Sequence, residues 1–253
     1  MVDCSRKSAS RDDRRRKIRP IWLHRAAMLV VPVFALVGCA HHHPVASAPA
    51  PPALTPTGSV VGEDMEYVAS HDPIDTLRGM ASWYGPNYNR HRAANGQVYD
   101  QNAVTAANRT LPMNSLIKVT NERTGQSAVM RITDRGPFVP DRILDLSMAA
   151  AKETGLYRAG VAPVRIDVYQ APKPIREGGR WCVQIGAFAH TGKAIHLRHQ
   201  LERRYPEAQV IDFAGPTGHW VRIRPAGDNR EQAEAIERHL HPAEGNAYLV
   251  RLD

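Results

Sequence analysis

Apolar and polar residues alternate in several short segments in the middle of the chain. Residues 116–120 and 128–133 alternate in this way, and the turn-forming stretch 121–125, which ends on glycine, lies between them. Alternation with a period of two is typical of a half-buried strand, so these two segments predict a β-hairpin. By the same criterion, residues 143–146 and 164–169 predict two further strands.

A sharp turn and a short helix complete this region. Asp134–Pro137 has the composition of a sharp turn and directly follows the second strand of the hairpin. Ser147 can cap a helix over Met148–Thr154, and Gly155 can end it. Many short strands with one short helix predict a small β-barrel over residues 78–170.

The pattern changes after residue 180, where an internal repeat begins. Val183–Ile185 is echoed by Val221–Ile223, and a tryptophan precedes each segment. One helix face follows each segment, at Ala194, Leu197 and Leu201 and again at Ala233, Ile236 and Leu240. A later strand follows each helix, at residues 209–213 and 247–250. The repeat predicts a βαββαβ unit over residues 180–253, with four strands in one sheet and two helices on one face.

The start of the second helix in this repeat has its own signal. Asp228 and Glu231 are three residues apart just before an apolar helix face, which predicts a capping box.

The N-terminal region reads as a targeting segment. An uncharged run of 13 residues, 26–38, follows a basic stretch and ends at Leu36–Cys39. This run is too short for a membrane span, which needs about 20 residues, but it suits a signal peptide over residues 1–38. Its end resembles a bacterial lipobox, in which the cysteine is lipidated, so we expect a lipid anchor on Cys39. Ala40 rather than aspartate after that cysteine favours the outer membrane.

The segments between these regions have linker composition. Residues 39–77 begin with three histidines (His41, His42 and His43) and continue with many Pro, Ala, Ser and Thr. Such a composition predicts a disordered tether, and the histidines offer at most a weak metal site because no fourth ligand stands at suitable spacing. Residues 171–179 predict a second, shorter linker.

Charge excludes one class of partner. The whole chain carries a formal net charge of +8, but residues 1–38 hold nine basic and three acidic residues. Subtracting that +6 leaves +2 for the rest of the chain, which gives no electrostatic basis for binding nucleic acid. The sheet-and-helix unit over residues 180–253 could also be interpreted as an RNA-binding module. The predicted export signal argues against that, because an exported protein meets no RNA.

Seven motifs in the barrel region follow one another in a recognisable order. They are Gly79–Gly85, Ala94–Gly96, Thr105–Ala107, Arg109–Pro112, Val119–Asn121, Asp134–Phe138 and Asp145–Ser147. This series resembles the rare lipoprotein A family, whose members are endolytic peptidoglycan transglycosylases with a six-stranded double-psi β-barrel. The resemblance covers about 90 residues.

The resemblance implies a reaction and a catalytic residue. A lytic transglycosylase cleaves the bond from N-acetylmuramic acid to N-acetylglucosamine without water and leaves a 1,6-anhydro end. Asp134 matches the family's catalytic aspartate and would act first as acid and then as base. An acid must hold its proton, so we expect burial to raise the pKa of Asp134. No cofactor or metal is implied, because the chemistry is proton transfer on a sugar.

Two departures from the family pattern leave a second hypothesis open. Gln97 stands where the family has glutamate, and Asn108 stands where it usually has histidine. Neither amide titrates, although both can hydrogen-bond to sugars. We therefore expect either an active enzyme or a non-catalytic glycan-binding lipoprotein at the division septum. Candidate substrate-binding residues are Gln97, Asn108, Trp83, Tyr84 and Arg135.

A second resemblance concerns the C-terminal repeat. Val183–Phe188, followed by Lys193 and Ala194, is similar to the SPOR (sporulation-related repeat) domain. Such domains bind glycan strands stripped of their stem peptides, which accumulate at the septum. Gln184 and Arg222 alternate with core positions, so we expect both to face outward and to bind glycan. The expected partners are peptide-free strands, the membrane through the lipid anchor and, as candidates, division proteins, at a location in the cell envelope.

Overall fold

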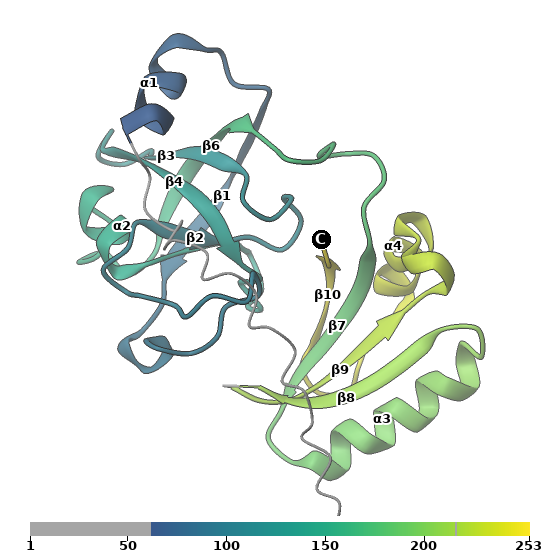
Figure 1. Cartoon of the computed structure of the whole chain (residues 1–253). Helices are drawn as coiled ribbons and strands as arrows, with labels where there is room; N and C mark the ends of the chain where they lie inside the picture. Colours follow the sequence, from purple (N-terminus) through teal and green to yellow (C-terminus); the bar gives the residue numbers. More distant parts are fainter. Residues whose placement is uncertain (1–61, 216) are drawn as a thin grey trace, which may run out of the picture. The chain divides into compact units, whose positions relative to one another are not determined.

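The computed structural model describes residues 62–215 and 217–253. The predicted signal peptide, Cys39 and the three histidines at 41–43 lie outside the described residues. Within the described part, a closed barrel is followed by a four-stranded sheet, and both belong to one compact unit (Figure 1).

Six strands form the barrel, in the order β1-β5-β2-β4-β3-β6. They are β1 (Asp75–Trp83), β2 (Thr105–Ala107), β3 (Leu116–Asn121), β4 (Ser127–Asp134), β5 (Arg142–Leu146) and β6 (Ala162–Gln170). The pairs β1/β5 and β2/β4 are parallel and the other pairs are antiparallel. The predicted six-stranded barrel and its hairpin, β3 with β4, are confirmed.

Alternating side chains of these strands fill the barrel, so the interior is a packed core. Its fully buried members include Ile117, Met130, Ile132, Leu144 and Ile166. The predicted short helix is α2 (Met148–Glu153), and the Ser147 side chain accepts a hydrogen bond from the Ala150 N–H as the N-cap.

The structure differs from the prediction of a tether through residue 77. Helix α1 (Gly62–Ser70) and the start of β1 lie in that stretch. Buried Asp64 pairs with Arg131 of β4, and Tyr67 and Val68 pack on apolar residues of the barrel wall. The helix is held by these tertiary contacts, which composition alone does not reveal. Strand β2 was also missed, because three residues are too few to show a period.

The C-terminal unit is an antiparallel sheet in the order β10-β7-β9-β8, as the repeat predicted. Its strands are β7 (Trp181–Phe188), β8 (Gln209–Gly215), β9 (Gly218–Arg224) and β10 (Asn246–Arg251), and its helices are α3 (Thr191–Arg204) and α4 (Arg230–His239). Both helices pack on one face through a shared apolar core.

One local prediction in this unit was wrong. The N-cap of α4 is Asn229, whose side chain accepts a hydrogen bond from the Gln232 N–H. Asp228 instead lies in the single turn η2 (Ala226–Asp228) and binds Arg224 and Arg180. Its carboxylate is therefore committed to two guanidinium groups and not to the helix.

The opposite face of the sheet is partly covered by the barrel. Phe138 packs on Trp220 and Tyr248, with ring centroids 5.1 and 5.7 Å apart. The Arg109 guanidinium lies 5.1 Å from the Tyr248 ring, and the Arg251 N–H donates 2.9 Å to the Arg109 carbonyl. Barrel residues thus cover part of the sheet face that its own helices leave free.

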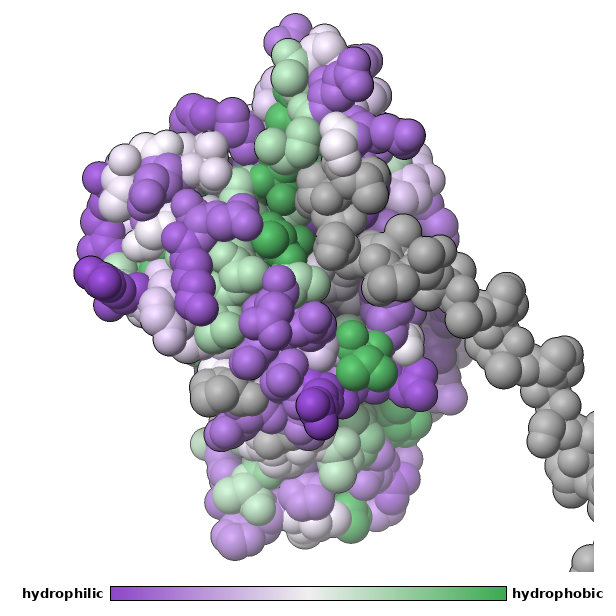
Figure 2. All heavy atoms as spheres, turned by 60° about the vertical axis from the view of Figure 1, so that its left-hand side comes forward, coloured by the Kyte–Doolittle hydropathy of each residue, from purple (hydrophilic) through white to green (hydrophobic). Residues whose placement is uncertain are grey.

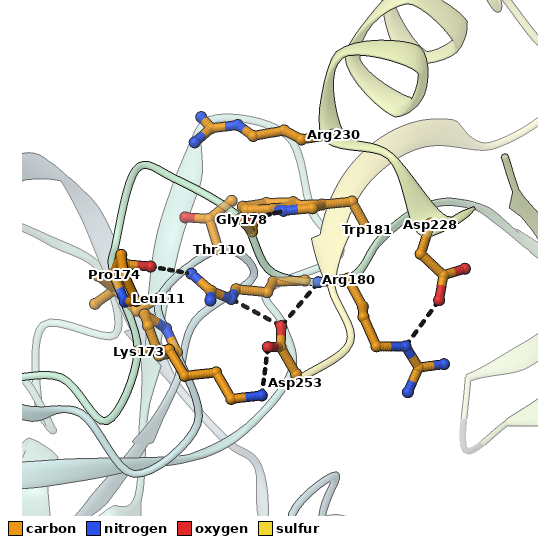
Figure 3. A network of polar contacts seen from close by, with 12 residues as sticks. Thr110, Leu111, Lys173, Pro174, Gly178, Arg180, Trp181, Asp228, Arg230 and Asp253 are labelled. Carbon is orange, nitrogen blue, oxygen red and sulfur yellow. Dashed lines mark hydrogen bonds and ion pairs between the residues drawn. The ribbon is translucent and has the colours of Figure 1, made fainter. Parts of the chain in front are cut away.

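A polar network fixes the end of β10 (Figure 3). Asp253 accepts hydrogen bonds from Lys173 (2.7 Å), from the Arg180 N–H (3.0 Å) and from Arg251 (2.9 Å). Arg251 is fully buried beneath the Trp181 ring, and it also donates to the Pro174 carbonyl. The segment 171–179 is thereby tied to the sheet.

The surface on the barrel side is mostly hydrophilic, and hydrophobic residues form a narrow band and isolated spots there (Figure 2). Among the described residues, no helix is both long and apolar enough to span a membrane.

The network around Asp253 predicts a pH-dependent stability. Burial alone would raise the pKa of Asp253, but the bonds from Arg251, Lys173 and the Arg180 N–H outweigh burial and hold that pKa well below its usual range. The stabilisation is therefore complete above the unfolded pKa of about 3.9 and is lost as pH falls from there through the folded value. Asp253→Asn should lower the unfolding free energy at pH 7 by about 1–3 kcal/mol.

Urea unfolding at pH 7 and at pH 3 checks this, because the difference from wild type should shrink at pH 3. Glu122→Gln is the matched control, since its pair with Arg78 is exposed and should be worth about 0–1 kcal/mol. An equal deficit for Asp253→Asn at both pH values would contradict the ionic role.

Candidate active site

A cleft of about 520 Å³ opens beside the end of β4, between the barrel and the sheet. Its barrel wall includes Tyr84, Ala94, Asp134, Phe138 and Asp145, and its sheet wall includes Gln184, Phe213, Trp220 and Arg222. This volume lies within the range of about 300–1,000 Å³ that is typical of small-molecule sites.

Asp134 is the last residue of β4, and its side chain is held by three hydrogen bonds. Oδ1 accepts from the backbone N–H groups of Ala94 and Arg135, both at 2.8 Å, and Oδ2 accepts from the Tyr84 hydroxyl at 3.2 Å. The chain turns away at Gly136, whose φ of +152° favours glycine. The strand end and the turn together place this carboxyl group in the cleft.

Burial raises the pKa of Asp134 above its ordinary value, although the N–H groups of Ala94 and Arg135 and the Tyr84 hydroxyl oppose the shift. This direction was predicted from the sequence. It increases the protonated fraction near neutral pH, which a general acid requires. The same three donors stabilise the carboxylate once the proton has left.

The two neighbouring arginines point elsewhere. Arg135 donates to the carbonyl oxygens of Asn108 (3.1 Å), Leu111 (2.8 Å) and Asp253 (2.7 Å). Arg131 pairs with Asp64 on α1. Arg135 lines the cleft, but its guanidinium is engaged with backbone carbonyls, so its position supports a structural role.

Asp145 is a second buried carboxyl group in the cleft, which the sequence reasoning did not single out as a site residue. It accepts from the Ser82 hydroxyl at 2.6 Å and from Arg142 at 3.4 Å. Burial raises the pKa of Asp145, while Ser82 and Arg142 oppose the shift. The available signal was the Asp145–Ser147 motif, in which an aspartate interrupts an apolar strand.

The barrel's strand order brings the two aspartates together. Ala107 of β2 is in register with Asp134 on one side and with Asp145 on the other. Neighbouring strands lie about 4.8 Å apart, so the two backbones are roughly 10 Å apart across one strand. In-register residues face the same side, so both carboxyl groups lie on the same side of the sheet as the fully buried Ala107 side chain.

Of the two aromatic candidates in the barrel, Tyr84 lies in the cleft and Trp83 lies outside it. Tyr84 lines the cleft and packs against Tyr88 and Tyr99. Trp83 is not part of the cleft lining, and its ring packs on Tyr157 instead, with centroids 4.7 Å apart.

The structure brings neither Gln97 nor Asn108 to the cleft surface. The Gln97 amide oxygen accepts from the Asn95 side chain at 2.8 Å. Asn108 is only 3% exposed; it accepts from the N–H groups of Thr110 and Leu111 and donates to the Ile143 carbonyl. Because the Asn108 amide holds its own loop in place, it presents no free group to a sugar.

The two sheet candidates do meet at the cleft. Gln184 and Arg222 are paired across β7 and β9, and an Arg222 Nη donates to the Gln184 side-chain oxygen at 2.9 Å. Both line the cleft. The prediction that Gln184 faces outward on an open sheet differs from the structure, where this side chain is only 4% exposed because the barrel lies over that face.

A metal site is not apparent in the part of the chain that the structure describes, where no cluster of three or more His, Cys, Asp or Glu has suitable geometry. The groups gathered in the cleft are two carboxyls, a half-buried phenol, aromatic rings and guanidinium donors. They suit proton transfer on a polyhydroxylated substrate.

Two known families match the two units. Residues 76–166 match the family described as lytic transglycolase, and residues 177–251 match the SPOR domain family.

Three relatives illustrate the similarity, and each is named endolytic peptidoglycan transglycosylase RlpA. The Vibrio cholerae protein is 50% identical over 185 residues, which is 70% of this chain and 70% of that protein. The Helicobacter pylori protein is 46% identical over 179 residues (59% and 56%), and that of Campylobacter jejuni is 39% identical over 157 residues (52% and 57%). The chain thus spans little more than half the length of the last two relatives. On these matches, the chain belongs to the RlpA family.

Proposed function

We propose that this chain is an endolytic peptidoglycan lytic transglycosylase that cleaves bonds from N-acetylmuramic acid to N-acetylglucosamine in peptide-free glycan strands. The observation that carries the proposal is Asp134, a half-buried carboxyl group with a raised pKa at the wall of a sugar-sized cleft. The names of the relatives and the matching transglycolase family agree with it.

Asp134 would act twice in one turnover. Protonated Asp134 gives its proton to the glycosidic oxygen, the bond from that oxygen to the muramyl C1 breaks, and N-acetylglucosamine leaves as an alcohol. The muramyl C6 hydroxyl then attacks C1 while its proton passes to the Asp134 carboxylate. The product is a 1,6-anhydro ring, Asp134 is again protonated, and no water is consumed. The N–H groups of Ala94 and Arg135 stabilise the carboxylate between the two steps.

Asp145 offers the second charge that such a reaction uses. A transition state with positive charge near C1 is stabilised by a nearby carboxylate in most glycosidases. Asp145 lies across Ala107 from Asp134. Burial raises the pKa of Asp145, and the Ser82 hydroxyl and Arg142 oppose that shift and favour the ionised form. The Gln97 side chain is outside the cleft lining, whereas Asp145 is part of it. We therefore assign the second carboxylate to Asp145, so glutamine at position 97 does not argue against catalysis.

The rest of the proposal concerns location. The SPOR match supports binding of peptide-free strands at the division septum and a location in the cell envelope. The sequence of residues 26–39 supports a lipid anchor on Cys39, in the outer membrane facing the periplasm. Division proteins are candidate partners there.

The acid–base role of Asp134 predicts the outcome of product analysis. The full chain in mild detergent, incubated with peptide-free strands, should release fragments with 1,6-anhydromuramyl ends that mass spectrometry detects. Asp134→Asn should lower that rate by roughly 10²–10⁴-fold, because it removes the group proposed to protonate the glycosidic oxygen. Asn102→Asp, a change at the surface away from the cleft, serves as the mutational control.

The rival hypothesis of a non-catalytic binding protein makes a different prediction. In that case wild type would bind strands without forming anhydro ends, and Gln97→Glu would be needed to gain activity.

The Tyr84 hydrogen bond predicts a shift in the pH profile. That bond lowers the pKa of Asp134, so Tyr84→Phe should raise the pKa further and keep the acid protonated to higher pH. The alkaline limb of kcat/KM should then move to higher pH, as initial rates across a pH series would show. Tyr88→Phe removes another hydroxyl of the cleft, one not bonded to Asp134, and should leave that limb in place. A limb that moves to lower pH in Tyr84→Phe would refute this arrangement.

A further inference from the structure

The cleft beside Asp134 has a second wall that the barrel does not supply. Gln184 of β7, Phe213 of β8 and Arg222 of β9 come from the sheet, and they line the same cavity as Asp134 and Tyr84. The chemistry assigned above to Asp134 therefore takes place in a space that both folded units enclose.

The sheet wall is fixed firmly against the barrel. The Trp220 ring packs on Phe138 with centroids 5.1 Å apart. Trp220 also lies against Gly186 and Gly215, where an added Cβ would approach its ring to 2.8 and 2.9 Å. Only glycine fits at these two positions, so the strand backbones can approach the indole closely.

Backbone bonds add to this attachment. The Met113 N–H donates to the Asp253 carbonyl at 3.3 Å, and Arg251 pairs with Arg109 in the same way at 2.9 Å. Arg135, next to Asp134 in sequence, also donates to the Asp253 carbonyl. The distance from Asp134 to the sheet wall is thus set by direct contacts, and not by the linker at 171–179.

The sheet wall carries groups that suit a glycan strand. Phe213 is partly exposed, and the Arg222 guanidinium lies 5.0 Å from its ring centroid. Arg222 donates one bond to Gln184, while its buried Nε has no protein partner. An aromatic face, an amide and a guanidinium can contact a sugar ring, its acetamido group and the lactyl carboxylate that a muramyl residue exposes once its peptide is removed.

We propose that the cleft is a single glycan site shared by the two units, in which the sheet wall holds the segment of the strand adjoining the bond that Asp134 cleaves. The inference rests on the function proposed above and adds to it. The sheet is then part of the substrate site itself, and Phe213 and Arg222 are binding residues of the cleavage reaction. The position of the cut follows from where the strand contacts the sheet.

Kinetics with substrates of two lengths test the proposal. With long peptide-free strands, Phe213→Ala in the full chain should raise KM by roughly tenfold and leave kcat nearly unchanged, because it removes binding without touching the acid. With a short fragment that reaches only the barrel wall, the variant should match wild type. Ile195→Ala, a comparable apolar truncation on the exposed side of α3, should behave as wild type with both substrates.

The outcomes separate this inference from the proposed function. If wild type forms anhydro ends and Phe213→Ala keeps the wild-type KM on long strands, the shared site is refuted and the transglycosylase remains. An equal loss on long and short substrates would also refute it, since a general folding defect acts on both.

A binding measurement covers the case in which wild type forms no anhydro ends. Amide resonances of Ala94 on the barrel wall and Arg222 on the sheet wall are followed by NMR as peptide-free oligosaccharide is added to Asp134→Asn. A single site requires both to titrate with one Kd, and Phe213→Ala should weaken both together. Two different Kd values, or a response on one wall alone, would overturn the shared site.

Discussion

The arrangement of the site depends on where the Arg135 side chain is directed. Its guanidinium donates to the backbone carbonyls of Asn108, Leu111 and Asp253, so one half-buried group ties a barrel loop and the end of the last strand to the base of the cleft. Burial, and then the nearby charge of Arg251, lowers the pKa of Arg135 to about 10, so it stays charged at neutral pH. Because this cation is occupied by carbonyls, it does not form an ion pair with the adjacent Asp134 carboxyl. Burial can therefore dominate the pKa of Asp134, and an acid is kept next to an arginine.

Barrel topology explains how one strand end becomes a two-carboxyl site. Asp134 and Asp145 are eleven residues apart in the sequence, yet the parallel pair β2/β4 and the antiparallel pair β2/β5 place them on either side of Ala107. Tyr84 directly follows β1 and lines the same cleft. Burial, and then the nearby charges of Asp134 and Asp145, raises the pKa of Tyr84, so its hydroxyl stays protonated and can donate. Burial raises the pKa of both acids, but the groups that oppose the shift differ. They are mainly two backbone N–H groups and the Tyr84 hydroxyl at Asp134, and the Ser82 hydroxyl and Arg142 at Asp145. Differences in environment are how two carboxyls acquire different roles.

One face of the sheet is covered by its helices, and the other face is covered only in part. Helices α3 and α4 cover one face, and Phe138, Arg109 and the end of β10 cover part of the other. The uncovered part of that face, at β8 and β9, opens into the cleft. The network around Arg251 and Asp253 keeps this arrangement in place by neutralising buried charges against one another, with Trp181 lying between Arg230 and Arg251. A charge network of this kind is costly to break on one side only.

The sequence by itself determined the local elements and the class of the protein. Period-two alternation found the β3/β4 hairpin, Ser147 marked the helix cap, and the spacing of apolar residues found both helices of the repeat, because each of these signals is contained in a few neighbouring residues. The motif around Asp134 indicated the acid. Only the tertiary structure decided that α1 is a helix, since its Asp64 is held by an ion pair with Arg131, which lies 67 residues away in the sequence. It also decided that Asp145 joins Asp134, that the Asn108 amide supports a loop, and that Gln184 lies beneath the barrel. These facts depend on strand order and on contacts between distant segments, which no local pattern encodes.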